Sequence, residues 1–161
     1  MAQDLVERFT ALHYHAINTF APGWARWRLR NGHRCIQFPE GNTTDARFSS
    51  VLSSLYNDSG LLVTLVWTGP DALAGVQWAA AFERDQAETN AFTGASFGHQ
   101  ENVVAAAPVA PDLAVYTQLT FASDEIDGLQ PLESYRLKVI RFTDGVAMDA
   151  FLYRVFIQNL T

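Results

Sequence analysis

The stretch from Leu61 to Glu83 constrains the fold most, because it holds two consecutive segments with the periodicity of β-strands. In LLVTLVWT every second residue up to Trp67 is large and apolar, and in VQWAAAFE the same spacing includes Trp78. β-Branched and aromatic residues carry both segments, which is typical of strands. We therefore predict two paired central strands, joined by a polar loop at Pro70 and Asp71, whose tryptophans form the centre of the core.

Composition indicates a single domain. The chain has 161 residues, of which 48% are hydrophobic, and this is enough for one core. Its 11 basic and 17 acidic residues give a net charge of −6, and the scattered basic residues argue against direct binding of nucleic acid. No apolar run reaches about 20 residues and no signal segment begins the chain, so we expect neither a membrane partner nor secretion. The single cysteine, Cys35, excludes an internal disulfide and a cysteine-based zinc site.

The first 20 residues have a different periodicity from the rest. Apolar residues from Leu5 to Phe20 recur at three- and four-residue spacing, and Pro22 and Gly23 follow, which favours an amphipathic helix or arm. The alternative is a strand around residues 12–17 that pairs with the edge of a sandwich. We divide the chain into an arm over residues 1–20 and a β-sandwich domain over residues 21–161.

Asn31 and Gly32 lie between two alternating segments and predict a β-hairpin, because both residues of such a tight turn adopt positive φ. Trp24 and Trp27 are an odd number of residues apart and cannot share a strand face, so either one is exposed or the strand begins after Ala25.

Further strands are predicted over residues 46–52, 102–107, 114–122, 135–142 and 147–159. In the last strand we place Phe151, Tyr153, Val155 and Ile157 on one side. Residues 84–98 are polar and form a long loop, with Phe92 and Phe97 as anchors. About eight short strands with turns between them predict an all-β fold, a two-sheet jelly-roll β-sandwich.

Metal-ligand patterns are weak in this sequence. His13 and His15 are two residues apart, but no acidic or thiol ligand stands at a recognisable spacing from them. Asp124, Glu125 and Asp127 form an acidic cluster that lacks the spacing and the glycine of an EF-hand, so a solvated turn explains it better. We therefore predict no metal ion and no cofactor.

Catalytic patterns are weak as well. The serines at positions 49, 50, 53 and 54 lie outside any nucleophile-elbow context, and no glycine-rich phosphate loop occurs. We predict no catalytic residue and no enzymatic activity.

Several blocks of the sequence together resemble a family of tailed-phage virion proteins built on a jelly roll. In that family a strand ending in tryptophan precedes a V-x-W-x-x-x-F strand, a T-F strand, an I-D-G-L turn, an R-L-x-V-x-R strand and a short final strand. The matching residues are Trp67; Val76, Trp78 and Phe82; Thr120 and Phe121; Ile126 to Leu129; and Arg136, Leu137, Val139 and Arg141. Similar features on the amino side are Leu12-His13, Phe38 and the F-S-x-V-L at residues 48–52 that leads to Tyr56. The resemblance thus runs from residue 12 to the end.

The resemblance implies a capsid cement or decoration protein, a homotrimer that binds the major capsid protein on the outside of the virion and is in the host cytoplasm during assembly. Such a protein binds the assembled lattice and not the free subunit, and three copies in one trimer add avidity. The chain has no stalk repeat, which favours head decoration over a fibre. The predicted contacts to capsid subunits or neighbouring protomers are Phe9, Tyr14, Trp24, Arg26, Trp27 and Phe97.

Two other functions stay open. A tail-fibre or receptor-binding component would recognise host surface glycan with exposed aromatic side chains as stacking platforms, and Trp24 or Phe97 could serve in this way. An assembly chaperone would be absent from finished particles.

Overall fold

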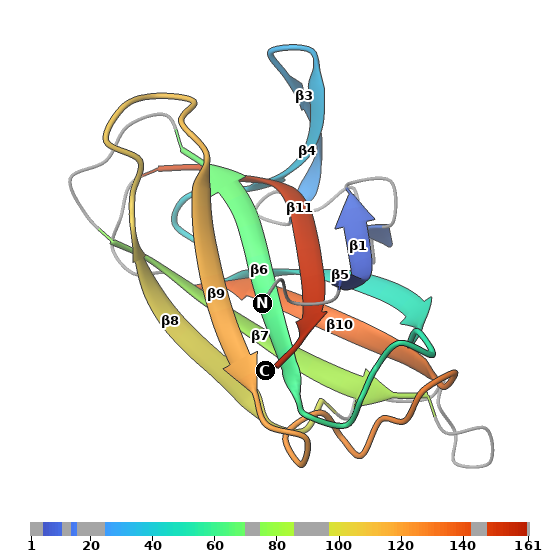
Figure 1. Cartoon of the computed structure of the whole chain (residues 1–161). Coiled ribbons are helices and arrows are strands. Elements are labelled where there is room, and N and C mark those ends of the chain that lie inside the picture. The colour runs from blue at the N-terminus through green and yellow to red at the C-terminus, as the bar shows by residue number, and fades with distance from the viewer. Residues whose placement is uncertain are drawn as a thin grey trace.

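The computed structural model describes residues 5–10, 14–15, 25–69, 75–85, 97–142 and 148–160. In these ranges the chain forms eleven strands and no helix, arranged as a two-sheet jelly-roll sandwich (Figure 1), which confirms the predicted fold class. The strands are β1 (Leu5–Thr10), β2 (Tyr14–His15), β3 (Arg26–Arg30), β4 (His33–Phe38), β5 (Thr44–Val51), β6 (Leu61–Thr68), β7 (Gly75–Arg84), β8 (Gln100–Ala106), β9 (Val115–Phe121), β10 (Ser134–Arg141) and β11 (Ala150–Asn159). Among the described residues, none form a helix long and apolar enough to cross a membrane.

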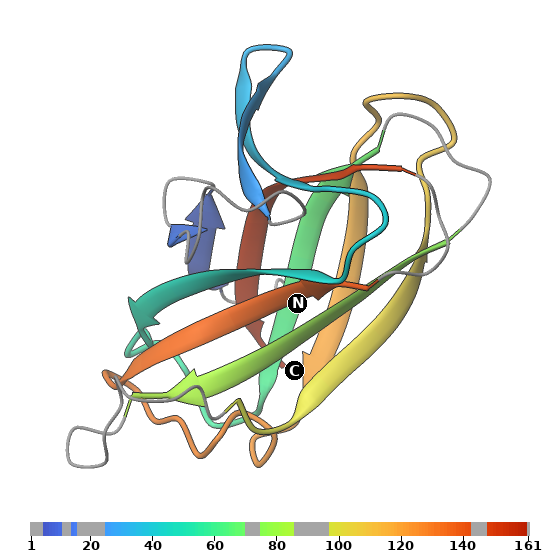
Figure 2. The same ribbon diagram turned by 180° about the vertical axis from the view of Figure 1, so that it is seen from behind.

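The two sheets are both antiparallel. The six-stranded sheet has the order β3-β4-β11-β6-β9, and β1 also pairs with β11. β4 pairs with the start of β11 and β1 with its second half, so both flank the same side of that strand. The five-stranded sheet has the order β2-β5-β10-β7-β8. Figure 1 has the six-stranded sheet in front, and Figure 2 shows the five-stranded sheet from behind.

The two central segments form core strands, but they lie in opposite sheets. β6 pairs with β9 and β11, whereas β7 pairs with β8 and β10. Trp67 and Trp78 are both buried and meet across the sandwich, with ring centroids 5.4 Å apart. The prediction of inward tryptophans is confirmed, while the prediction that the two strands pair is wrong. Alternation shows which face of a strand is buried, but not which neighbour shares its hydrogen bonds.

The predicted amino-terminal helix is not observed. β1 pairs with β11, and β2 pairs with β5 at the edge of the five-stranded sheet, as the strand alternative predicts. Phe9 is 2% exposed and packs on Phe48 and Tyr135, with ring centroids at 5.3 and 6.4 Å. A helix of so few residues is only marginally stable, whereas the strand gains hydrogen bonds with β11 and buries Phe9. The strand therefore forms despite the helical spacing of the apolar residues. The domain boundary at residue 20 lies outside the described residues and stays a prediction.

The hairpin at Asn31-Gly32 is confirmed. The two residues have φ of 48° and 78°, and β3 begins at Arg26, directly after Ala25. This hairpin projects beyond the sandwich in both views (Figures 1 and 2).

β11 departs from the predicted alternation. Its register with β6 shifts between Leu152 and Arg154, which makes Tyr153 an additional residue in the strand. Phe151 and Tyr153 therefore face outward, whereas Val155 and Ile157 belong to the core. The prediction that all four share one side is wrong because a bulge moves the following residues to the other face.

A partly buried polar contact ties β1 to the five-stranded sheet. The phenol of Tyr135 donates a hydrogen bond to the carboxylate of Glu7, and Ser50 Oγ donates to Glu7 Oε1 at 2.8 Å. Burial, followed by the charge of Glu7, raises the pKa of Tyr135 far above its ordinary range. The phenol therefore stays protonated in the folded protein at any pH at which the fold persists.

Replacing Tyr135 with phenylalanine is expected to make the protein less sensitive to alkali. An unfolded tyrosine loses its proton near about pH 10, whereas folded Tyr135 keeps it, so the free energy of unfolding falls above that pH by up to about 1.4 kcal/mol per pH unit. Below about pH 10 this residue contributes no pH dependence. Denaturant unfolding between about pH 8 and 11 should give a steeper decline for the wild type than for Tyr135→Phe. Parallel curves for the two proteins would contradict the prediction.

Candidate functional site

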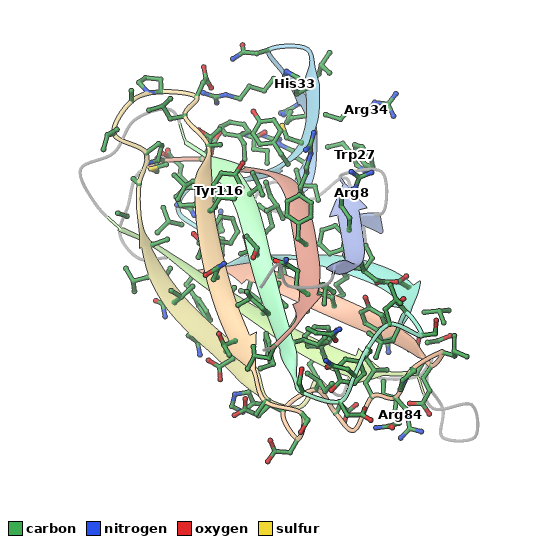
Figure 3. The ribbon with its side chains drawn as sticks, in the orientation of Figure 1. Arg8, Trp27, His33, Arg34, Arg84 and Tyr116 are labelled. Atoms are coloured by element: carbon green, nitrogen blue, oxygen red, sulfur yellow. The ribbon has the colours of Figure 1, made fainter. Side chains whose placement is uncertain are left out.

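A groove lies on the outer face of the six-stranded sheet, beside the β3–β4 hairpin. It encloses about 570 Å³, a volume typical of small-molecule sites. Its lining residues are Asn31, His33, Arg34, Val66, Asp112, Ala114, Tyr116, Tyr153, Arg154 and Phe156. Figure 3 shows Tyr116 over the sheet and His33 on the hairpin. The groove thus joins side chains from the hairpin, the loop before β9, and strands β6, β9 and β11.

Strand register defines the floor of the groove. Val66 on β6 lies opposite both Arg154 on β11 and Tyr116 on β9, so these three residues form one row across the sheet. Neighbouring strands are about 4.8 Å apart, which puts the Cα atoms of Arg154 and Tyr116 roughly 10 Å apart. Val66 is 8% exposed and Tyr116 is 68% exposed. The row therefore offers an apolar floor between an aromatic ring and a guanidinium group.

The bulge in β11 adds a second aromatic hydroxyl to the groove. The ring of Tyr153 meets that of His33 edge-on, with centroids 6.4 Å apart. Burial is the main cause that raises the pKa of Tyr153, so its phenol is protonated at neutral pH and can donate a hydrogen bond. Phe156 lies one row further along β11, opposite Thr64 on β6.

Asp112 and the hairpin turn form one wall of the groove. Arg30 Nε donates to Asp112 Oδ1 at 2.5 Å, and Asn31 Nδ2 donates to Asp112 Oδ2 at 3.0 Å. These two hydrogen bonds hold the pKa of Asp112 below its ordinary value. The guanidinium of Arg30 also stacks on the Phe151 ring, 4.2 Å from its centroid. Asp112 is therefore an ionised carboxylate whose charge is balanced, and it ties the hairpin to the loop before β9.

Three of the contact residues predicted on the amino side, Phe9, Arg26 and Trp27, are described and do not line this groove. Phe9 is 2% exposed and lies in the core, and its contact to a partner stays a prediction. Trp27 is half-buried and packs against the core, and Arg26 Nε donates to Gln37 Oε1 at 3.1 Å. Trp24 lies outside the described residues, and for Tyr14 only the backbone pairing of β2 with β5 is described.

Phe97 lies on the opposite side of the molecule. Its ring centroid is 4.3 Å from Lys138 Nζ and 5.5 Å from the guanidinium carbon of Arg47, both on the outer face of the five-stranded sheet. These cations cover the ring, so Phe97 anchors its loop there. The second predicted anchor, Phe92, lies outside the described residues.

Two carboxylates of the acidic cluster at residues 124–127 accept hydrogen bonds from the backbone of nearby residues. Glu125 Oε2 accepts the backbone N–H of Ala122 at 2.8 Å, and Asp127 Oδ2 accepts that of Arg84 at 2.9 Å. These bonds support the interpretation as a solvated turn. His13 lies outside the described residues, as does the side chain of His15.

His99, Glu101 and Glu125 form a group that sequence reasoning missed. Their potential ligand atoms lie within 4.8 Å of one another and could hold a metal ion. His99 Nε2 is 2.5 Å from Glu101 Oε1 and 3.5 Å from Glu125 Oε1. The hydrogen bond to Glu101, with the charge of Glu125, raises the pKa of His99, so a proton competes for the same nitrogen. A hydrogen-bonded surface pair accounts for this arrangement.

Comparison with known proteins gives a likeness of fold. Neither a family model nor a curated protein matches the sequence. A putative sugar binding protein from Bacteroides thetaiotaomicron superimposes with a TM-score of 0.58 and 11% identity, over 96% of this chain and 88% of that one. The CBM36-1 domain of a multidomain xylanase from the hindgut metagenome of Trinervitermes trinervoides gives 0.53 and 6%, over 96% and 98%. The mannan-recognising carbohydrate-binding module TmCBM27 gives 0.52 and 10%, over 100% of both chains.

These neighbours overturn the capsid-cement function predicted from the sequence. They are carbohydrate-binding modules and a putative sugar binding protein, and they fit the glycan-binding alternative better. Of the residues predicted to contact the capsid, Phe9 fills the core and Trp27 is half-buried against it. The phage-family resemblance, the trimer, the capsid partner and the virion location stay predictions that none of these observations test.

Proposed function

We propose that this protein is a non-catalytic carbohydrate-binding module whose ligand lies in the groove on the six-stranded sheet. The row Tyr116–Val66–Arg154 carries the proposal. A sugar ring has an apolar C–H face edged by hydroxyl groups, so it suits a site that combines an exposed aromatic ring, an apolar floor and nearby hydrogen-bonding groups. Tyr116 supplies the ring, Val66 the floor, and Arg154, Tyr153 and Asn31 the polar groups.

The groove is held in shape by the structure around it, as expected of a preformed binding site. Its floor lies on three hydrogen-bonded strands, and its wall is fixed by the contacts of Asp112 with Arg30 and Asn31. A site held in this way loses little conformational entropy when a ligand binds. The fold likeness to carbohydrate-binding modules supports the same function.

The carboxylates of the groove favour binding over hydrolysis. Most glycoside hydrolases use two carboxyl groups on either side of the scissile bond. Among the described residues that line the groove, Asp112 is the only acid, and it is engaged by Arg30 and Asn31. The finer setting, a tail-fibre or receptor-binding component that attaches to host surface glycan, is compatible with this groove, and a cell-adsorption assay tests it.

Tyr116→Ala is expected to weaken glycan binding by tenfold or more, because the stacking surface is removed. The wild type is first screened on a glycan array, and the affinity for the best ligand is then measured by titration calorimetry. The matched control is Leu132→Ala, since Leu132 is 70% exposed and lies outside the groove. The proposal fails if the wild type binds no glycan, or if Tyr116→Ala binds as tightly as the control.

A further inference from the structure

The basic residues are unevenly distributed over the two sheets. Of the 11 lysines and arginines, six lie on strands of the six-stranded sheet: Arg8, Arg26, Arg28, Arg30, Arg34 and Arg154. On the outer face of the five-stranded sheet two of the cations are paired with acids instead: Arg47 pairs with Asp45 at 2.8 Å and Arg136 with Glu83 at 2.8 Å. A chain with a net charge of −6 therefore carries a local excess of positive charge around the groove.

Strand register places these arginines relative to the groove. Arg26 and Arg28 lie opposite Gln37 and Cys35, and Gln37 also lies opposite the outward-facing Phe151, so both arginines face outward. Arg154 is in the floor row of the groove, and Arg8 is opposite Phe156 in the next row. Arg34 lines the rim, and Figure 3 shows its side chain pointing away from Tyr116.

Among the residues that the structure describes, little negative charge opposes these cations. Asp112 is paired with Arg30, and Asp149 accepts hydrogen bonds from Gln37 and from the backbone N–H of Glu40. The partner shared by Arg26 and Arg28 is the neutral amide oxygen of Gln37, which leaves their charges in place.

Arg154 has a free guanidinium at the centre of this face. In the described ranges, no carboxylate lies within ion-pair distance of it. Its side chain is exposed, yet its backbone is fixed between β6 and β1. It can therefore bind an anion without first giving up an ion pair within this part of the protein.

We infer that the groove takes an anionic saccharide, one whose carboxylate or sulfate group binds Arg154. This rests on the proposed function. The Cα atoms of Tyr116 and Arg154 are roughly 10 Å apart, on either side of Val66. A sugar ring stacked on Tyr116 above Val66 therefore extends toward Arg154. A guanidinium offers paired N–H donors that match carboxylate and sulfate oxygens, and such charge-assisted bonds are about twice as strong as neutral ones. Arg8, one row further, can meet the charge of a following sugar unit.

The test compares charged polymers with matched neutral ones, using the full chain. Polygalacturonate is paired with its methyl ester, and dextran sulfate with dextran, so the two pairs separate a carboxylate ligand from a sulfate ligand. Polyglutamate serves as a polyanion without sugar. The variants are Arg154→Gln, Tyr116→Ala and, as control, Arg47→Gln on the other sheet.

We expect the wild type to bind one charged polymer at least tenfold more tightly than its neutral partner, with affinity falling as salt rises. Arg154→Gln should remove this preference, so that charged and neutral partners bind equally, whereas Arg47→Gln should bind as the wild type does. Equal binding of charged and neutral polymers, lost in Tyr116→Ala, would overturn the inference and leave the proposed function intact. Binding of polyglutamate as tight as that of the charged polymer would also overturn the inference, and binding of no saccharide would overturn both.

Discussion

Replacing Trp67 or Trp78 with alanine is expected to lower the free energy of unfolding by about 3–5 kcal/mol. Both indoles are fully buried, and they meet each other across the two sheets with centroids 5.4 Å apart. Phe38 adds a further edge-on contact to Trp78 at 5.1 Å. Each truncation therefore removes packing between the layers of the sandwich, where the remaining backbone cannot close the cavity without shifting a whole sheet.

The phenylalanine variants of the same residues separate packing from hydrogen bonding. Trp67 Nε1 donates to Thr117 Oγ1 at 2.8 Å, whereas Trp78 Nε1 is buried without a hydrogen-bond partner in the described structure. Trp67→Phe should therefore cost about 1–2 kcal/mol more than Trp78→Phe, because it also leaves the buried Thr117 hydroxyl without its donor. Chemical denaturation of all four variants measures these differences. Equal costs for the two phenylalanine variants would show that the indole N–H of Trp67 contributes no net stability.

The burial of the central strands could be predicted from the sequence, but their pairing could not. Alternation of apolar residues around Trp67 and Trp78 reports which side of each strand meets the core. Both a paired hairpin and two strands in facing sheets satisfy that pattern equally well. The structure places β6 and β7 in different sheets.

The groove could not be predicted from the sequence, for a different reason. It combines a hairpin turn, a loop and three strands that are adjacent only in the folded chain, and Tyr153 enters it through a bulge that no composition signal marks. One signal was present: Tyr116 is an aromatic residue at a position where alternation predicts a side chain facing water. The position of Arg154 in the groove could not be predicted in this way. Arg154 lies opposite Val66 only because the bulge shifts the register of β11 against β6.

The resemblance to phage proteins predicted the fold but not the function. Most of its matching residues are buried in this structure, among them Trp67, Trp78, Phe121 and Leu137. Such positions are shared by jelly rolls with unrelated functions, because they follow from packing two sheets together. None of the described residues that line the groove is among the residues that carry the resemblance. The resemblance therefore contains no information about the proposed binding site.

Gly60→Ala is expected to lower the free energy of unfolding by about 2–5 kcal/mol, which is more than a change of one methyl group normally costs. Gly60 immediately precedes β6 and has a φ of 94°, a conformation that side-chain-bearing residues rarely adopt. A Cβ atom there would lie 2.3 Å from the carbonyl oxygen of Phe121 and 3.2 Å from the backbone of Ala122. Since both contacts are backbone atoms of the paired strand β9 and the turn after it, relief requires the β6–β9 pairing to shift at that end.

Gly41→Ala is the matched control for this prediction. Gly41 also has a positive φ, 75°, but a Cβ atom there meets nothing within 4 Å. It should therefore show only the conformational cost, about 1–2 kcal/mol. Denaturant unfolding of the two variants isolates the effect of the close approach to Phe121, and the cost at Gly60 should exceed that at Gly41 by about 1 kcal/mol or more. Equal losses of stability would mean that the end of β6 can move away from β9 at little cost, and that this pairing does not hold the sheet edge in place.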